Sequence, residues 1–294
     1  MTIQLIETQV RNYLAKVARG EKSPLSTEII EEYKAACERS LRRQLEEKRD
    51  GFRIRMSNIG KPLCQLQLEA KGIKGLSPPY NAIMNGMFGD NIEAMTIAIL
   101  QAAGVTIQSK FERVSLEIGG INMKGELDVI IDDVVYDIKS SSDFSFDKKF
   151  SENTREFYEN DAFGYLTQGV LYAKAKGKPF GGWIVTNKDN GEIKGVPATV
   201  DTELRNIILF NIENKIDTLR NNAIFRKCFT DREEKFRKVP TGNRILEIAC
   251  AYCSFKKECW PQVEYKSSLV SESKTPKWFW YTHTDERFKH GNEV

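Results

Sequence analysis

Apolar side chains recur at intervals of three and four residues in four stretches of the sequence, and each stretch predicts a helix. Ser26 or Thr27 is a suitable N-terminal cap within the first stretch. Gly104 and Gly177 follow the second and third stretches, where glycine is typical of a helix C-terminus. The four predicted helical stretches are residues 3–48, 89–103, 155–176 and 202–221.

Between these helices the apolar spacing shortens to two, which predicts strands. Residues 105–118 lead through Gly119 and Gly120 to 121–131, so these two strands should form a hairpin. After a turn at Asp132 and Asp133, residues 134–139 predict a third, buried strand, and 182–186 predict a fourth. The order helix, three strands, helix, strand predicts an α/β fold with a mixed central sheet flanked by helices, preceded by an N-terminal helical extension.

The composition is that of a folded, water-soluble chain. The 294 residues include 44 Lys and Arg against 41 Asp and Glu, a formal net charge of +3. With 29% charged and 40% hydrophobic residues, the chain is close to globular averages. It contains no apolar run long enough to span a bilayer and no signal-like N-terminus, so we expect a cytoplasmic protein without membrane contact.

Residue counts also narrow the chemistry. Only two histidines are present, His283 and His290, so hydrolases with a Ser-His-Asp triad and zinc-dependent deaminases are poor candidates. Six cysteines in a chain of this length without a secretion signal favour metal binding or burial over a disulfide framework.

Two acidic residues and a lysine are the most informative group in the sequence. Asp137 and Lys139 are two residues apart in the predicted third strand, so their side chains point to the same side. Asp128 on the preceding strand can approach them across the turn. Carboxylates prefer Mg²⁺ or Mn²⁺, and a lysine can stabilise developing negative charge, so the group fits phosphodiester hydrolysis. The alternative is a solvated ion pair on an edge strand.

A cysteine group lies near the C-terminus. Cys250, Cys253 and Cys259 have the spacing C-x₂-C-x₅-C, which is too dense for ordinary core packing. Three thiolates need a fourth ligand to bind either Zn²⁺ or an iron–sulfur cluster, and the spacing alone does not distinguish these.

The acidic residues and the lysine, in this order of elements, resemble the PD-(D/E)XK nucleases, specifically the RecB-like branch. The resemblance spans most of residues 53–261 and implies a restriction-endonuclease-like core. It implies that Asp128, Asp137 and the main-chain carbonyl of Ile138 bind Mg²⁺ or Mn²⁺ and that Lys139 is the catalytic lysine. The proline that usually precedes the first acid is Leu127 here.

Two further motifs agree with this resemblance. Gln168 and Tyr172 match the Q-x-x-x-Y motif of the branch and, four residues apart, share one helix face, so they are expected to position DNA. Glu93 stands where a histidine is frequent in the branch, and related exonucleases have Glu there, so it is expected to be a further metal ligand. The alternative interpretation of Glu93 is an exposed glutamate in the first turn of a helix, favoured by the helix dipole.

The cysteines resemble those of RecB-like nucleases from CRISPR adaptation and AddAB helicase–nucleases. That similarity adds Cys64 to Cys250, Cys253 and Cys259 as ligands of a 4Fe–4S cluster that clasps the two ends of the nuclease core, with Zn²⁺ as the alternative. We expect Cys37 and Cys228 to be ordinary buried thiols. The expected domains are a helical extension at 1–50, the nuclease core with its clasp at 51–263, and a polar and aromatic tail at 264–294.

Local charge is compatible with a nucleic-acid partner. Residues 226–244 hold seven Lys and Arg against three acids, and a second arginine group precedes the core. The aromatic run at 278–281 can stack on bases or dock the tail. We expect a metal-dependent DNA exonuclease of recombination, repair, phage genome processing or CRISPR adaptation. The alternatives are a structure-specific endonuclease and a non-catalytic DNA-binding or complex-forming subunit. The sequence leaves a partner protein and the oligomeric state open.

Overall fold

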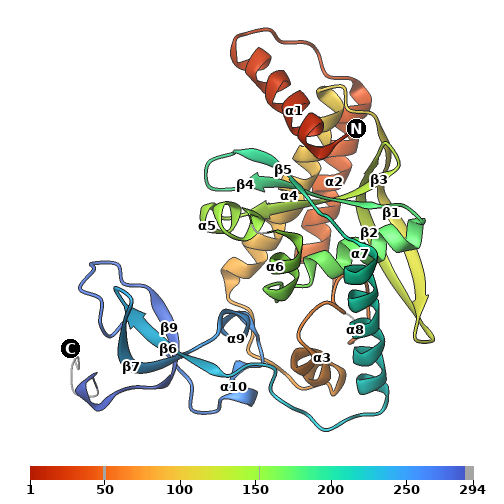
Figure 1. The fold of residues 1–294 in the computed structure, drawn as a ribbon. Helices are drawn as coiled ribbons and strands as arrows, with labels where there is room; N and C mark the ends of the chain where they lie inside the picture. Colours follow the sequence, from red (N-terminus) through yellow and green to blue (C-terminus); the bar gives the residue numbers. More distant parts are fainter. Residues whose placement is uncertain (49–50, 152, 289–294) are drawn as a thin grey trace. The chain divides into compact units, whose positions relative to one another are not determined.

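The fold is described from a computed structural model of residues 1–48, 51–151 and 153–288. His290 and the end of the expected tail lie outside these residues. The chain divides into two units, one of residues 1–61 and 79–220 and one of residues 62–78 and 221–294. We call them the larger unit and the smaller unit. The chain passes between them after residues 61, 78 and 220 (Figure 1).

A five-stranded mixed sheet forms the centre of the larger unit. Its strands lie in the order β1-β2-β3-β4-β5. Only the pair β3 and β4 is parallel, and the crossover between them carries helices. The other neighbours are antiparallel. The predicted mixed central sheet flanked by helices is therefore confirmed. The strands are β1 (Ile107–Ile118), β2 (Ile121–Ile131), β3 (Val134–Ser141), β4 (Phe180–Asn187) and β5 (Ile193–Pro197).

The hairpin turns lie where the sequence predicted them. Gly119 and Gly120 have φ of 54° and 69°, and Asp132 and Asp133 have φ of 49° and 61°. Positive φ at both central residues is typical of the two-residue turn whose twist matches the flanking strands. The second of these turns fixes the register of β3 on β2, in which Val129 pairs with Tyr136.

Helices cover both faces of this sheet. Helices α1 and α4 pack on one face, where Ile6, Leu100, Val129 and Ile138 belong to one buried cluster. Helix α7 packs on the other face, where Trp183 of β4 stacks on Phe157 at 4.4 Å between ring centroids. The helical elements of the larger unit are α1 (Ile3–Ala18), α2 (Thr27–Leu45), α4 (Tyr80–Ala102), α5 (Asp143–Asp147), η1 (Lys149–Ser151), α6 (Thr154–Glu159), α7 (Tyr165–Lys176) and α8 (Thr202–Arg220).

Three helix predictions need correction. The stretch 3–48 is two helices, because the polar segment 19–26 separates them and Ser26 caps α2 by accepting from the Ile29 amide at 3.3 Å. The stretch 155–176 is also two helices, α6 and α7. Gly164 between them has φ of +78°, and the Asp161 carboxylate accepts from the Gly164 and Leu166 amides. The predicted helix 89–103 starts nine residues earlier, at Tyr80 directly after Pro79.

The smaller unit has its own four-stranded antiparallel sheet, in the order β6-β7-β9-β8. The sequence predicted no strand after residue 221. Buried Glu234 accepts from Asn243 Nδ2 and from the Tyr281 hydroxyl, both at 2.8 Å, so a polar network joins three of these strands. The elements of this unit are α3 (Leu63–Ala70), β6 (Asp231–Phe236), β7 (Val239–Leu246), α9 (Ile248–Tyr252), α10 (Lys256–Cys259), β8 (Glu264–Ser267), β9 (Trp278–His283) and η2 (Glu286–Phe288).

A helix that spans a membrane needs a minimum length and a predominantly apolar sequence. Among the described residues, no helix is both long enough and apolar enough to cross a bilayer.

Candidate functional site

The structure brings the predicted acidic residues and lysine together at β2 and β3. Lys139 Nζ lies 2.6 Å from Asp137 Oδ2, as their shared strand face predicted. Asp128 Oδ2 accepts a hydrogen bond of 2.6 Å from the Ile138 amide, which holds its carboxylate beside Asp137. The Ile138 carbonyl lies 3.4 Å from Lys139 Nζ. Asp128, Asp137, Ile138 and Lys139 thus form one compact group.

Asp137 is a buried carboxylate with unused hydrogen-bonding capacity. Its side chain has 0% exposure, and neither oxygen accepts a hydrogen bond of ordinary geometry, although Lys139 is in ion-pair contact. Burial raises the pKa of Asp137, and the nearby Lys139 ammonium partly offsets the rise. Burial also raises the pKa of Asp128 well above its usual range, with further increases from Glu93 and Asp137. Burial alone would lower the pKa of Lys139, but the Asp137 and Asp128 carboxylates outweigh it and hold that pKa high.

Glu93 joins this group from the middle of α4. Since α4 starts at Tyr80, Glu93 is well beyond the first turn, and the interpretation as an exposed first-turn residue is wrong. Burial raises the pKa of Glu93 to about 7, against a lowering by Lys139 and with a further rise from Asp137. Glu93 also raises the pKa of Asp128, because the two negative charges repel each other. Three carboxylates that share one buried region carry unfavourable charge without a cation.

Gln168 and Tyr172 lie on one face of α7, as predicted. Gln168 Nε2 donates to the Tyr172 hydroxyl at 2.9 Å. Tyr172 is only 2% exposed and packs on Gly125 of β2, where a Cβ would lie 2.5 Å from the tyrosine ring. Gln168 is only partly buried. Tyr172 therefore orients Gln168, and Gln168 is the member of the pair that can reach a substrate.

Sequence reasoning missed a second polar group beside the first. Lys139 Nζ lies 5.3 Å from the Tyr165 ring centroid, and Lys149 Nζ lies 4.7 Å from the same centroid. Lys149 also pairs with Asp161 at 3.1 Å, and the Asp161 side chain is 2% exposed. The sequence feature that could have revealed this group is residues 161–164, which precede the start of α7 but lie within a continuous apolar pattern. Tyr165 is in contact with both lysines.

The donor set of this group suits a hard divalent cation. Buried carboxylates and a main-chain carbonyl are typical Mg²⁺ or Mn²⁺ ligands, and Asp128, Asp137 and the Ile138 carbonyl supply these donor types here. In the described part of the chain, however, no set of three or more His, Cys, Asp or Glu already has the arrangement of a metal site. The residues present fit the ion in their chemistry.

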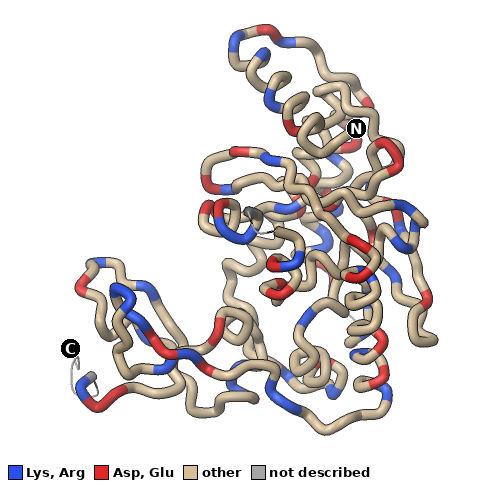
Figure 2. The backbone as a smooth tube through the Cα atoms, viewed as in Figure 1, with Lys and Arg blue, Asp and Glu red and all other residues tan. Residues whose placement is uncertain are grey.

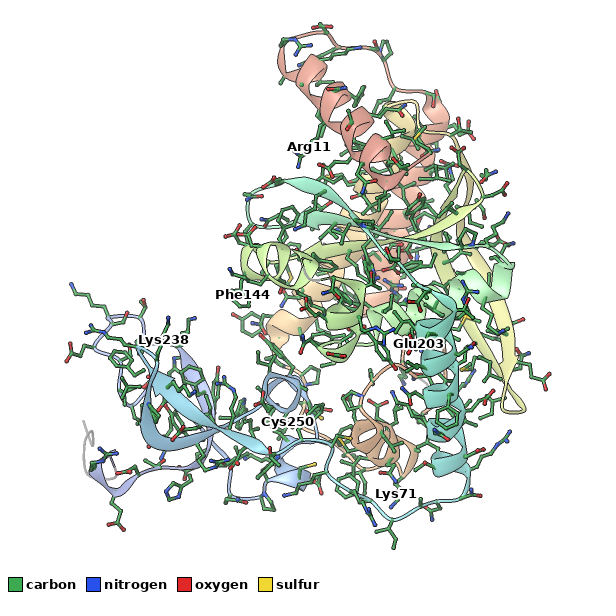
Figure 3. The ribbon with its side chains drawn as sticks, viewed as in Figure 1. Arg11, Lys71, Phe144, Glu203, Lys238 and Cys250 are labelled. Atoms are coloured by element: carbon green, nitrogen blue, oxygen red, sulfur yellow. The ribbon has the colours of Figure 1, made fainter. Side chains whose placement is uncertain are left out.

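The four predicted cysteine ligands line one cavity in the smaller unit. Cys64 lies in the first turn of α3, Cys250 in α9, Cys253 just after α9 and Cys259 at the end of α10 (Figure 3 labels Cys250). Burial raises the pKa of Cys250 to about 11, with a further rise from Cys253 and Cys259. Burial likewise raises the pKa of Cys259. Neutral thiols are thus favoured until a cation compensates their charge.

A buried indole donor faces the same cavity. Trp260 Nε1 is buried without a hydrogen-bond partner of ordinary geometry, and it lies close enough to Cys250 to lower the pKa of that thiol. An N–H group directed at sulfur stabilises a thiolate. Thiols beside an N–H donor suit a thiolate-bound Zn²⁺ or an iron–sulfur cluster in their chemistry. Among the described residues, however, no three of these cysteines already have the arrangement of a metal site.

Cys228 was wrongly expected to be a buried thiol. It is exposed, and its Sγ accepts a hydrogen bond of 3.1 Å from the Cys64 amide. Its thiol also interacts with that of Cys64, and this contact is the largest cause of the raised pKa of Cys64. Cys37 is partly buried on α2. Five of the six cysteines therefore belong to the smaller unit, one more than a tetrathiolate site needs.

Comparison with known proteins gives little guidance. No protein-family model matches the sequence, and no curated protein matches it. Four chains among the solved structures match, and one is the crystal structure of SSO0001. That chain is 15% identical, with a TM-score of 0.43, over 76% of this chain and 93% of SSO0001. A likeness at this level supports no conclusion about function.

Proposed function

We propose that this protein is a Mg²⁺- or Mn²⁺-dependent DNA nuclease with a RecB-like PD-(D/E)XK core, and that it acts as an exonuclease. The observation that carries the proposal is Asp137, a fully buried carboxylate that contacts Lys139 at 2.6 Å and lies beside a second buried carboxylate, Asp128. A buried charge needs a partner or a metal, and one lysine leaves most of the acceptor capacity of Asp137, Asp128 and Glu93 unused.

Each residue of the group has a distinct part in this proposal. Asp128, Asp137, Glu93 and the Ile138 carbonyl hold the ion, which when bound polarises the phosphodiester and lowers the pKa of water. Lys139 carries a positive charge that its carboxylate neighbours stabilise, so it can neutralise charge that develops on the phosphate. Gln168, oriented by Tyr172, contacts the DNA. The Tyr165 ring covers Lys139 and limits its hydration.

The cysteine cavity is proposed to hold a 4Fe–4S cluster through Cys64, Cys250, Cys253 and Cys259, with Zn²⁺ as the alternative. Its support is the convergence of the four thiols on one cavity together with the Trp260 indole N–H, which lies close enough to Cys250 to lower the pKa of that thiol. Such a group would join α3 to the segment 250–259 and would stabilise the smaller unit, whose own core is small.

Degradation of linear against closed circular DNA tests the nuclease proposal. Each form is supplied single- and double-stranded with Mg²⁺ or Mn²⁺, and Asp137→Asn and Lys139→Ala proteins serve as controls. We expect degradation of linear DNA only, lost in both variants. The matched control is Lys178→Ala, which removes a partly exposed lysine paired with Asp133 and should leave activity unchanged.

The other outcomes separate the alternatives. Cutting of closed circles that depends on Asp137 would identify an endonuclease. DNA binding without cleavage under Mn²⁺ by protein with its cysteine site loaded would favour a binding subunit. Full activity in either site variant would refute the assignment of this site.

A further inference from the structure

Three aromatic side chains gather on the smaller unit, two of them exposed and the third, Trp280, partly buried. Strands β8 and β9 are antiparallel, with Tyr265 opposite Trp280. The Tyr265 ring lies 5.2 Å from the Trp278 ring and 4.8 Å from the Trp280 ring, each at 33° between planes. Tyr265 is 53% exposed and Trp278 is 55% exposed. We call Tyr265, Trp278 and Trp280 the aromatic face.

The aromatic face is separate from the core of the smaller unit. Side chains alternate along β9, so Phe279 and Tyr281 point to the opposite side from Trp278 and Trp280. Tyr281 is 2% exposed and its hydroxyl donates to buried Glu234 at 2.8 Å, so the inner side of β9 is fully packed. Burial of the core therefore does not explain why three large rings gather on the outer side, and exposed groups of this kind mark binding surfaces.

Two exposed lysines lie next to the aromatic face, since Lys266 and Lys277 adjoin Tyr265 and Trp278 in the sequence. Lys266 also pairs with Glu264 at 2.5 Å. Lys256 Nζ lies 4.7 Å from the Trp280 ring centroid, but its side chain is buried and packs on that ring instead of facing solvent. The smaller unit has 16 Lys and Arg against 11 Asp and Glu, whereas the larger unit has 28 against 30. The excess of basic residues in the chain thus belongs to the unit that carries the rings.

A basic hairpin tip adds to this charge within the same sheet. Strands β6 and β7 are joined by a tight turn at Arg237 and Lys238, which have φ of 50° and 70°. These two residues and Lys235 are exposed, and Lys238 is labelled at the hairpin in Figure 3. Figure 2 shows the basic residues of this hairpin as a blue segment of the tube. No acidic residue lies between Lys235 and Arg244 to offset them.

We propose that the aromatic face binds single-stranded DNA by stacking its rings on unpaired bases while the surrounding lysines contact the phosphates. Aromatic rings combined with basic residues are the two parts of sequence-tolerant single-strand binding. A duplex buries the faces of its bases and offers only their edges in the grooves, so exposed ring faces fit an unpaired strand. This inference rests on the proposed nuclease function, because it names the form of DNA that the enzyme holds.

Binding of a fluorescent oligothymidylate, followed by anisotropy, tests the inference. The experiment uses the full chain with Asp137→Asn and no divalent cation, so cleavage does not interfere. We expect Trp278→Ala and Tyr265→Ala to weaken binding by about tenfold each, since loss of one stacked base costs about that factor. Trp278→Phe keeps a ring and should retain most of the affinity. Phe210→Ala, which removes an exposed aromatic residue of α8, is the matched control and should change nothing.

An abasic oligonucleotide of the same length separates stacking from charge. The Asp137→Asn protein should bind it more weakly than oligothymidylate, and Trp278→Ala should not weaken it further. Unchanged oligothymidylate affinity in both alanine variants would overturn the inference. If these variants keep their affinity but change their oligomeric state or melt at a lower temperature, the rings contact protein instead of DNA, and the inference is likewise overturned. The binding assay measures no cleavage, so its result can be interpreted even if the nuclease assay fails. The nuclease assay can likewise be interpreted if the binding assay fails.

Discussion

At the scale of single residues, the candidate active site is a balance among buried charges. Among the residues that the structure describes, Lys139 is the cation in ion-pair contact with Asp137, and Lys139 in turn is held charged by Asp137 and Asp128. Removing one member of a buried pair costs more than the pair contributes, because it leaves the other charge uncompensated. The two residues should therefore respond to mutation in stability as well as in activity.

Lys139→Met is expected to destabilise the metal-free protein by about 3–5 kcal/mol at neutral pH, since methionine keeps most of the volume but leaves the buried Asp137 charge unpaired. Urea unfolding measures this change. Lys178→Met is the control, because it removes an exposed ion pair worth at most about 1 kcal/mol. Equal effects of the two substitutions would contradict the assignment of a buried charge to Asp137.

Glu93 is expected to make the metal-free protein less stable as pH rises. Its pKa is raised from 4.5 to about 7 in the folded state, so the fold favours the protonated form. The resulting stabilisation is fully present below the unfolded pKa and is lost as pH rises to the folded pKa. The loss amounts to up to about 3 kcal/mol. Glu93→Gln should remove this part of the dependence.

The measurement is the difference in the free energy of unfolding between the wild type and Glu93→Gln, made at about pH 5 and at about pH 8 without divalent cations. We expect the variant to gain stability relative to wild type at the higher pH. A difference that does not change with pH would show that Glu93 has an ordinary pKa in the fold.

At the scale of elements, the start of α7 is fixed by a close backbone contact. A Cβ at Gly60 would lie 2.5 Å from Gly164 Cα, and a Cβ at Gly164 would lie 2.5 Å from Gly60 Cα. Both neighbours are backbone atoms that a side-chain rotation cannot move. This contact sets the position of α7, and with it Tyr165 and Gln168.

Gly60→Ala is expected to destabilise the protein by about 1–3 kcal/mol because the added methyl group forces the two backbones apart. Gly51→Ala is the matched control, since a Cβ there meets no atom within 4 Å. Thermal unfolding of both variants checks the prediction. A melting temperature for Gly60→Ala equal to that of Gly51→Ala would mean that the backbones separate without cost.

The sequence was informative where a local pattern determines the structure. The three consecutive strands and their turns follow from period-two burial and from residues that accept positive φ, such as Gly119 and Asp132. The break before α7 was missed because Ala162 and Phe163 continue the apolar pattern while the Asp161 cap and Gly164 interrupt the helix. The sheet β6-β7-β9-β8 was missed because β6 and β7 carry mostly polar residues and bury two of them, Glu234 and Asn243, inside.

The same distinction applies to the candidate site. Strand spacing was enough to bring Asp128, Asp137 and Lys139 together, and helix spacing was enough for Gln168 and Tyr172. Tyr165 and Lys149 depend on how α7 and η1 pack on β3, which no local pattern encodes. Cys228 reaches Cys64 across 164 residues of sequence, so only the tertiary structure reveals that contact.

At the scale of the whole molecule, charge and chemistry are divided between two units of different character. The larger unit, with 28 basic and 30 acidic residues, holds the carboxylates of the candidate active site. The smaller unit, with 16 basic and 11 acidic residues, holds five thiols and the aromatic face. The proposed catalytic and cysteine-bound groups can therefore be perturbed separately.

The fifth thiol predicts an unequal response to cysteine substitution. Cys253→Ser should abolish visible absorbance and bound iron or zinc in anaerobically purified protein. Cys64→Ser should retain part of both, because Cys228 is adjacent and can replace it, and the double variant Cys64→Ser with Cys228→Ser should lose both. Absorbance with iron signifies a cluster, whereas zinc is colourless. Complete loss in Cys64→Ser alone would exclude replacement by Cys228.

The smaller unit is assembled from two separate lengths of chain, 62–78 and 221–294, with the rest of the protein inserted between them. No single truncation can therefore release it as a complete fragment. A chain that ends before Asn221 would keep α3 and Cys64 but lack the other four cysteines of the smaller unit. A chain that starts after Pro78 would keep those four cysteines but lack Cys64. Dissection of this protein requires a circular permutant or a fusion that joins the two segments directly.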